Sequence, residues 1–527
     1  MRHTGVQLLR QSKKLLDTFT TTPIYYANAD PHIGHIYTSI LADTSHRWNL
    51  LTNPDEKHIF STGTDEHGSK IFRASQRDGK SANEFCDEVS GKFRELFQKF
   101  SLSNTHFIRT TDRAHAEAVQ KFWQILEKGG YIYKSTYSGY YSVVDECFFP
   151  FDQVESKLVN GDYQKVVKGS NTLVEWVEEE NYIFKLSHFR EPVRKWLKES
   201  KVVQPTNYAA LAESYTHMEE DLSVSRSSQR LSWGIPVPND ESQTIYVWMD
   251  ALVNYLTVAG YPGKMNVWPP TCQIIGKDIL KFHAFYWPAF LMAAELPLPK
   301  KLFVHGHWLA DGVKMSKSLG NVVHPNDLAD KYTVEGVRYF LLKQGNPHDD
   351  SNFSSSACFD VINSDLVNNI GNLLQRSTVK KMNEKEVYPT LNVASIPVEI
   401  RDEATQLIDF LGNLKDSSEH LYNEMHYYKV IEGIMNTMKE ANRVFQQTQP
   451  WKERDEEKLA AILYLAYESV RISTIILQPI VPEFSAFCLD RLNIPSSQRG
   501  FENATFGNYN GGHLGENRGI AMKRLEK

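Results

Sequence analysis

The sequence predicts an α/β protein, in which a doubly wound parallel sheet is divided by an inserted segment and followed by an α-helical bundle. Strand-length apolar runs alternate with helix-length amphipathic segments in two separate stretches, a pattern typical of parallel β-α-β units. Beyond Gly345, apolar residues instead recur every three or four positions, which is the helical period. A length of 527 residues implies about three or four domains.

The alternating pattern gives the elements of the sheet in order. The expected strands are residues 20–25, 57–61, 244–248, 273–275 and 301–305. The expected helices between them are residues 34–51, 250–258 and 280–293. We therefore expect two halves of one sheet-forming domain, residues 19–112 and 231–344.

The segment between the two halves, residues 113–230, has a different texture and is predicted to be an inserted domain. Its long strands are expected at 131–141 and 173–185, around a polar loop at 155–170.

The helical bundle is predicted over residues 345–495. Apolar residues from Ile431 to Phe445 keep helical spacing, and residues 459–476 behave similarly before a proline. The remaining residues, 496–527, are predicted to be loop and tail.

Charge and cysteine content exclude several classes of protein. The formal net charge of −6 excludes a uniformly basic nucleic-acid coat, so a polyanionic partner must be bound by local basic patches. The five cysteines lie far apart and favour a reducing compartment over a disulfide framework. Because no uncharged apolar run reaches about 18 residues, we expect no membrane span.

The first 18 residues resemble a mitochondrial presequence. They carry Arg2, Arg10, Lys13 and Lys14 among leucines and valine, with no acidic residue before Asp17. An ordinary N-terminus is the alternative, although it would usually contain acidic residues. We expect import into the mitochondrial matrix.

The first candidate catalytic motif is His-Ile-Gly-His, residues 32–35, at the start of the first expected helix. Gly34 allows a ligand to approach the backbone closely, and a helix N-terminus attracts phosphate. His32 and His35 can hydrogen-bond the same anion. This motif alone is weak, because such a histidine pair is more often structural.

The second candidate motif is Lys-Met-Ser-Lys-Ser, residues 314–318, after the last expected strand. Lys314 and Lys317, beside the hydroxyl of Ser316, can hold a polyphosphate by their charges. Alone, the motif would be read as a solvated basic turn. The occurrence of both motifs, at opposite ends of one α/β unit, favours a nucleotide-binding site.

These residues resemble the class I aminoacyl-tRNA synthetases, and within them the methionyl-tRNA synthetases of mitochondrial type. The resemblance extends from about Thr20 to Lys527, and further motifs occur in the same order. They are PIYYANADPHIGH, TGTDEHG, VEWVEEENYIFKLS, YVWMDALVNY, GKDILKFHAFYWPA, GNLLQRS and ANRVFQQTQPW. The resemblance implies a Rossmann-like catalytic domain, an inserted connective-peptide domain and a helical anticodon-binding domain.

The implied reaction forms methionyl-adenylate from methionine and ATP with Mg²⁺, and then transfers methionine to the terminal ribose of tRNA(Met). Catalysis of this type is mainly positioning and electrostatic stabilisation. By resemblance, the ATP-binding residues are His32, Gly34, His35, Lys314, Ser316 and Lys317, with the two histidines and two lysines catalytic. The Mg²⁺ ion is expected to be coordinated mainly by phosphate oxygens and water.

The resemblance also implies a methionine pocket with Asp65 as the partner of the α-ammonium group. The other implied members are Ile24, Tyr26, Trp248, Leu252, Tyr255, Ile279, His283 and Trp287. Aromatic walls suit a flexible, polarisable thioether. Without the resemblance, these aromatic segments would be read as ordinary core.

Two departures or absences shape the remaining expectations. Many relatives carry CxxC zinc knuckles in the insert, whereas residues 137–154 hold only Cys147, so we expect no structural zinc. The insert is also too short for the separate editing domain of the isoleucine, valine and leucine enzymes. No dimerisation module follows the bundle, so we expect a monomer.

The bundle is expected to read the anticodon. Asn372 and Arg376 are four residues apart and share one helix face, and Trp451 can stack on an unpaired base. The alternatives are a solvated face and a core tryptophan. For the whole chain, two rivals remain: the cysteine enzyme, which needs zinc ligands, and a catalytically dead tRNA-binding relative, which would not need both motifs.

Overall fold

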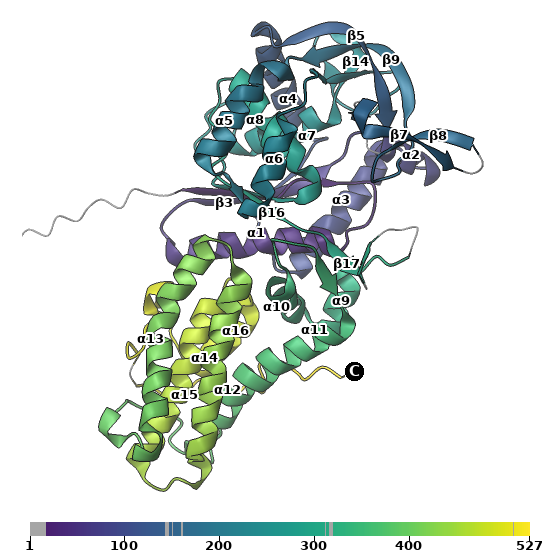
Figure 1. Cartoon of the computed structure of the whole chain (residues 1–527). Helices are drawn as coiled ribbons and strands as arrows, with labels where there is room; N and C mark the ends of the chain where they lie inside the picture. The colour runs from purple at the N-terminus through teal and green to yellow at the C-terminus, as the bar shows by residue number, and fades with distance from the viewer. Residues whose placement is uncertain are drawn as a thin grey trace, which may run out of the picture.

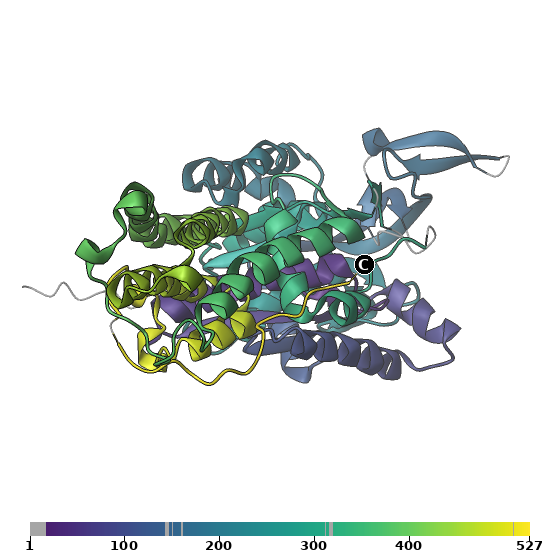
Figure 2. The same cartoon turned by 90° about the horizontal axis from the view of Figure 1, so that it is seen from below.

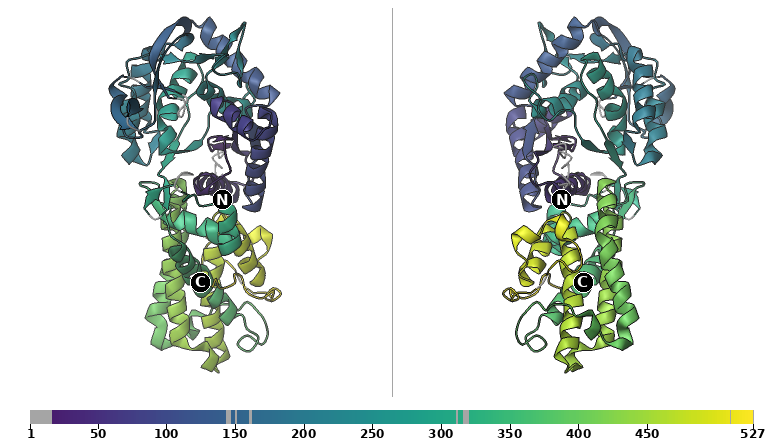
Figure 3. Two further views of the ribbon diagram at one scale, coloured as in Figure 1. Left: turned by 90° about the vertical axis from the view of Figure 1, so that its right-hand side faces the viewer. Right: turned by 90° about the vertical axis from the view of Figure 1, so that its left-hand side faces the viewer.

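The computed structural model describes residues 17–142, 147–149, 151–159, 162–310, 312–315, 320–509 and 511–526. It consists of an α/β part and a helical part (Figure 1). Two side views show the helical part extending from one end of the α/β part (Figure 3).

A parallel sheet forms the centre of the α/β part. Its strand order is β10-β16-β15-β1-β3-β2, and β4 also pairs with β3. The strands are β1 (Thr18–Thr21), β2 (Tyr25–Tyr26), β3 (His58–Asp65), β4 (His106–Arg109), β10 (Val203–Gln204), β15 (Cys272–Gly276) and β16 (Leu302–His305). Because β15 pairs with β1 in parallel, strands from before and after the inserted segment form one sheet. The predicted fold class is confirmed.

The order in which strands are added to the sheet reverses beside β1. From β1 the chain continues to β3 on one side, whereas β15 and β16 lie on the other. Helix α1 (Ile33–Thr52) packs against β1, β3 and β15. Ligands of doubly wound sheets bind at the carboxyl ends of strands at such a switch point. The start of α1 lies at this position.

Further helices cover the α/β part. They are α2 (Ser69–Arg77), α3 (Ala82–Lys99), α4 (Arg113–Lys128), α5 (Arg190–Ser200), α6 (Ala209–Tyr215), α7 (Val247–Ala259) and α8 (Trp287–Ala293).

Two elements of the second half differ from the prediction. The strand expected at 244–248 is β14 (Asp240–Ile245), which pairs antiparallel with β12 (Ser225–Ser227) and β13 (Pro236–Val237), outside the parallel sheet. Its apolar run continues directly into α7, and apolarity alone does not separate a strand from a buried helix. The helix expected at 280–293 begins with π-helical residues Phe282–Tyr286 before α8.

The inserted segment contains an antiparallel sheet in the order β11-β9-β5-β6. Its strands are β5 (Ile132–Ser142), β6 (Cys147–Phe149), β9 (Glu175–Phe184) and β11 (Leu222–Ser223). The two long strands agree with the prediction. The expected polar loop is wrong, because it forms the hairpin of β7 (Val154–Val159) and β8 (Asp162–Val167), which projects from the molecule (Figure 2).

Aromatic contacts hold the inserted sheet near Cys147, whose side chain lies outside the described part. The ring centroids of Tyr141 and Phe148 are 5.0 Å apart, and those of Tyr140 and Trp176 are 5.1 Å apart. The segment also supplies β10 to the edge of the parallel sheet. The domain boundaries given above stay predictions.

Short elements connect the sheet to the bundle. They are β17 (Trp308–Ala310), β18 (Val313–Lys314), α9 (Pro325–Tyr332), α10 (Val334–Gln344), β19 (Ser351–Phe353), α11 (Ser355–Ile362), a π-helix (Asn363–Gly371) and α12 (Asn372–Ser377). The expectation that strands end at Gly345 is wrong for β19, which pairs in parallel with β17.

The bundle is formed by α13 (Arg401–Asn423), α14 (Tyr427–Thr448), α15 (Glu456–Leu477) and α16 (Pro482–Arg491) (Figure 1). The predicted helical spacing is confirmed in α14 and α15. Among the described residues, α15 alone is long and apolar enough to cross a membrane, and 89% of its most apolar window is buried in the protein. It is the central helix of the bundle core.

A buried arginine joins the bundle to the helix that begins with the first motif. Arg338 of α10 donates to the Asp43 carboxylate of α1 at 2.6 Å, and to the carbonyl oxygens of Pro479 and Ile480 between α15 and α16. Both charged side chains are fully buried. The pair therefore ties the two parts of the molecule together through its core.

Candidate active site

The first motif caps helix α1 through its own histidines. Gly34 N–H donates to Nδ1 of His32 at 3.1 Å, and His32 N–H donates to Nδ1 of His35 at 3.1 Å. The two rings stack with centroids 3.7 Å apart. A Cβ atom at Gly34 would lie 3.0 Å from the His32 ring, so a larger residue would have to displace the capping histidine.

These hydrogen bonds determine the tautomer of both rings. Because each Nδ1 accepts a backbone N–H, a neutral ring carries its proton on Nε2. Burial, and then the charge of His32, lower the pKa of His35 well below its usual value. His35 is therefore a neutral hydrogen-bond donor near pH 7.

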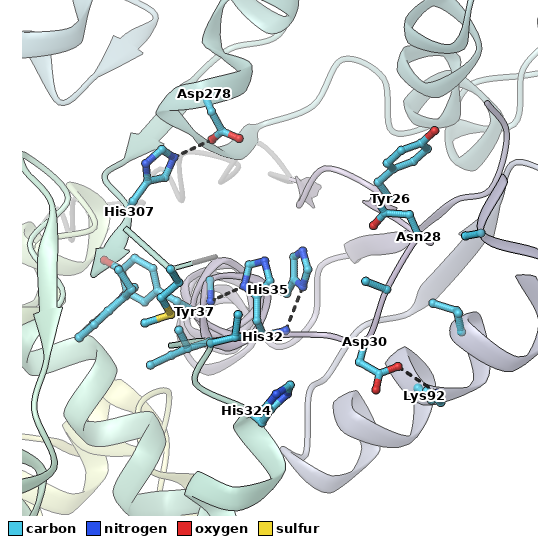
Figure 4. A pocket seen from close by; sticks show the side chains of 18 of the residues that line it. Tyr26, Asn28, Asp30, His32, His35, Tyr37, Lys92, Asp278, His307 and His324 are labelled. Atoms are coloured by element: carbon cyan, nitrogen blue, oxygen red, sulfur yellow. Dashed lines mark hydrogen bonds and ion pairs between the residues drawn. The ribbon is translucent and has the colours of Figure 1, made fainter. Parts of the chain in front are cut away.

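A cavity of about 930 Å³ opens at the start of α1 (Figure 4). Its lining includes His32, Gly34 and His35, with Tyr26 on another side. The cavity lies at the carboxyl ends of β15 and β16, where the sheet changes direction. This is the position at which doubly wound sheets bind nucleotides.

The opposite wall of the cavity carries functional candidates that were not predicted from the sequence. Asp278 follows β15, while His305 ends β16 and His307 follows it. His307 Nε2 lies 3.1 Å from the Asp278 carboxylate, and His305 Nε2 lies 2.9 Å from the hydroxyl of Thr38 on α1. Their place directly after two parallel strands is the signal that could have identified them.

The second motif adjoins the same cavity. Lys314 ends β18, which pairs with β17. Met315, the second residue of the motif, and Gly320, two residues after its end, line the cavity. Ser316 and Lys317, together with the side chain of Lys314, lie outside the described residues. The described start of the second motif, and Gly320 beyond it, thus lie at the same cavity as the first motif.

The residues implied for methionine lie in two groups. Tyr26 and Asp65 are register partners on β2 and β3, and Ile24 immediately precedes β2. The second group lies on α7 and around the π-helix before α8. Its members are Trp248, Leu252, Tyr255, Ile279, His283 and Trp287; His283 is a buried polar residue, and the other five belong to or pack against one hydrophobic cluster.

A buried histidine organises the second group. Tyr255 donates its hydroxyl proton to Nε2 of His283 at 2.8 Å, while Nδ1 of His283 donates to the Ile279 carbonyl oxygen at 3.0 Å. Burial lowers the pKa of His283 to about 4, so the ring is neutral. Trp248 stacks on Phe282 with centroids 3.5 Å apart. The buried indole N–H of Trp287 has no hydrogen-bond partner in the described part.

The fold agrees with comparisons to known proteins. Residues 18–378 match the family described as tRNA synthetases class I (M). The chain is 42% identical to the mitochondrial methionine–tRNA ligase of Xenopus laevis, covering 96% of this chain and 92% of that protein. The human mitochondrial enzyme is also 42% identical, with 97% and 91% covered. Mycobacterium tuberculosis methionyl-tRNA synthetase in complex with methionyl-adenylate superposes with a TM-score of 0.88 at 35% identity, over 94% of this chain and 98% of that one.

The chain belongs to the methionyl-tRNA synthetases.

For a methionyl-tRNA synthetase, the end of the bundle away from the cavity is the candidate tRNA surface. Arg376 of α12 lies over the Trp451 ring at 5.4 Å and over the Phe445 ring at 5.2 Å. Trp451 is 45% exposed, and Asn372 is exposed one turn before Arg376. The structure therefore brings together the three residues predicted to read the anticodon, and the core alternative for Trp451 is wrong.

Two further carboxylates of the synthetase were not predicted. Glu66 is fully buried and receives two hydrogen bonds from Arg109, at 2.7 and 2.9 Å. Asp250 accepts from His67 and His115, at 2.7 and 2.8 Å. Within the described ranges, no group of three or more His, Cys, Asp or Glu residues could hold a metal ion.

Proposed function

We propose that this chain is a methionine–tRNA ligase of the mitochondrial matrix, which forms methionyl-adenylate and pyrophosphate and then charges tRNA(Met). The observation that carries the proposal is one cavity lined by the capped start of α1, by Met315 of the second motif and by Gly320 just after it. Membership of the methionyl-tRNA synthetases supports the choice of amino acid. ATP enters with Mg²⁺ as its counter-ion.

In the first step, a carboxylate oxygen of methionine attacks the α-phosphorus of ATP, and pyrophosphate leaves. His32 and His35 contribute Nε2–H donors, and the start of α1 adds its positive partial charge. Lys317, supported by Lys314, neutralises the departing pyrophosphate. No covalent intermediate with the protein is required, because positioning and charge stabilisation carry the rate enhancement.

Methionine is bound between the two groups of residues described above. Asp65 pairs with the α-ammonium group, and the aromatic side chains on α7 and α8 surround the thioether. The unpartnered indole N–H of Trp287 supports a polar ligand atom near that wall, since a buried donor without a partner costs about 1–3 kcal/mol. Several contacts are needed, because one methylene contributes only about 1–3 kcal/mol of discrimination.

Charging of tRNA tests the complete reaction. Purified protein with ATP, Mg²⁺ and radiolabelled methionine should form methionyl-tRNA(Met) that is sensitive to mild base, as expected for a ribose ester. Labelling of tRNA by another radiolabelled amino acid, but not by radiolabelled methionine, would contradict the proposal. Light scattering of the same sample should give the mass of a monomer.

Trp451→Ala should weaken tRNA charging while adenylate formation is retained. Loss of one stacked base costs about 1–3 kcal/mol, which corresponds to about 5–150-fold in kcat/KM for tRNA. Phe410→Ala is a matched control, since this bundle aromatic is 40% exposed and was not assigned to the anticodon. Equal losses of charging and ATP–pyrophosphate exchange in Trp451→Ala would refute an anticodon role.

Deleting residues 1–16 should prevent mitochondrial import of a fluorescent fusion while leaving methionine-dependent exchange in place. The deletion removes all four basic residues of the predicted presequence and none of the described residues. Replacing Glu526 by Gln, at the other end of the chain, should leave import unchanged. Import of the truncated fusion at the full-length level would contradict the prediction.

A further inference from the structure

A buried carboxylate joins the two groups of residues proposed to bind methionine. Asp250 is 1% exposed, and its two oxygens accept hydrogen bonds from Nδ1 of His67 and Nε2 of His115. His115 is fully buried and His67 is 7% exposed. A carboxylate at this depth is tolerated only when it is paired and hydrogen-bonded, so both imidazoles are needed to keep it in place.

The network connects three elements. His67 lies in the turn between β3 and α2, two residues after Asp65, while Asp250 lies in the first turn of α7, two residues after Trp248. His115 belongs to the first turn of α4 and also reaches the hydroxyl of Thr257, further along α7, at 3.0 Å. The His67–Asp250 contact therefore restrains the separation between the turn of Asp65 and the helix of Trp248.

The turn that carries His67 is anchored independently on its other side. The adjacent Glu66 is held by Arg109 and by the hydroxyls of Thr64 and Thr111, and its carbonyl oxygen accepts the indole N–H of Trp233 at 2.6 Å. Because Glu66 already fixes the turn of His67 to β4, this turn can form without the Asp250 network. The additional effect of the Asp250 network is to fix the position of α7 relative to Asp65.

Charge reinforces this restraint. Burial alone would raise the pKa of Asp250, but nearby His67 and the hydrogen bonds from His115 and His67 hold it below its usual value. The carboxylate also lies in the first turn of α7, where the helix dipole favours a negative charge.

We propose that Asp250, acting through His67 and His115, is a positioning residue that fixes the distance between the carboxylate binding the methionine ammonium group and the helix binding the methionine side chain. The inference rests on the proposed function. It predicts that loss of the network weakens use of methionine while leaving the ATP site at the start of α1 intact.

Asp250→Asn tests this in ATP–pyrophosphate exchange. A misplacement of about 1 Å can cost about 100-fold, so KM for methionine should rise about 10–100-fold while KM for ATP stays within about two-fold. Glu468→Gln is the matched control, because Glu468 is equally buried and accepts two hydrogen bonds from Arg471 in the bundle. This control should lower the melting temperature without changing KM for methionine.

A pair of substitutions at His67 keeps the test decisive if Asp250→Asn folds poorly. His67→Asn can retain a donor at the position of Nδ1 and should keep KM for methionine near the wild-type value, whereas His67→Leu should raise it. If wild-type protein exchanges with methionine but all three variants lower kcat with KM unchanged, the positioning role is overturned. If wild-type protein does not exchange with methionine at all, the proposed function itself fails.

Discussion

Replacing His35 by Asn should lower the rate of methionine-dependent ATP–pyrophosphate exchange by about 100- to 1000-fold. The amide oxygen of Asn can occupy the position of Nδ1 and accept the His32 N–H, so the cap of α1 is retained. The Nε2–H donor aimed at the developing phosphate charge is lost, and one preorganised donor of this kind contributes about 2.7–4 kcal/mol. His32→Asn should behave similarly, because Asn is a favourable cap for the Gly34 N–H.

The control for both variants lies on the same helix. His46 is buried, hydrogen-bonds Ser103 through Nδ1 at 2.8 Å, and does not line the cavity. His46→Asn should change exchange by less than about two-fold at saturating substrates, since it touches no phosphate position. A loss in His35→Asn no greater than that in His46→Asn would mean that the first motif only caps the helix.

Arg338→Leu should destabilise the protein by about 3–5 kcal/mol, the largest stability effect expected here. The substitution leaves the Asp43 carboxylate buried with its main partner removed, and breaking a buried pair on one side is strongly unfavourable. Urea unfolding followed by tryptophan fluorescence should show an earlier transition. Arg113→Leu is the matched control, because Arg113 is 93% exposed in its pair with Glu117 and contributes at most about 1 kcal/mol.

The same pair predicts the response to acid. Burial alone would raise the pKa of Asp43, but Arg338, Arg47 and hydrogen bonds from Ser103 hold it below its ordinary value. A lowered folded-state pKa stabilises the protein fully above the unfolded value near 4 and loses this effect as pH falls through the folded value. In Arg338→Leu the carboxylate stays buried without its main partner, so Asp43 takes up a proton at higher pH than in wild type. The difference in stability between the two proteins should therefore be largest at neutral pH and above, and should shrink as the pH falls. A difference that grows on acidification would contradict this assignment.

The sequence is sufficient to predict those features that depend on residues close together in the chain. His32, Gly34 and His35 were placed correctly because an expected strand, a turn and an amphipathic helix surround them. The helices α14 and α15 follow from the helical spacing of their apolar residues, and the long strands β5 and β9 from strand-like stretches of sequence. These features depend on neighbours in the chain.

Other features depend on contacts that no local pattern specifies. His67 and Asp250 are 183 positions apart, and nothing near either residue indicates the partner. The hairpin of β7 and β8 was read as loop because its residues are largely exposed on both faces and lack clear alternation. Residues 244–248 are predicted as one strand, whereas β14 ends at Ile245 and α7 begins at Val247, because apolarity alone does not separate a strand from a buried helix.

The most direct test of the proposed function is ATP–pyrophosphate exchange by the purified full chain with each amino acid supplied separately. Methionine should support exchange in the presence of Mg²⁺, while leucine and cysteine should not. Exchange that ignores methionine but responds to leucine or cysteine would contradict the assigned substrate. Absence of exchange with every amino acid, together with binding of tRNA, would show instead that the cavity at the start of α1 has lost its catalytic function.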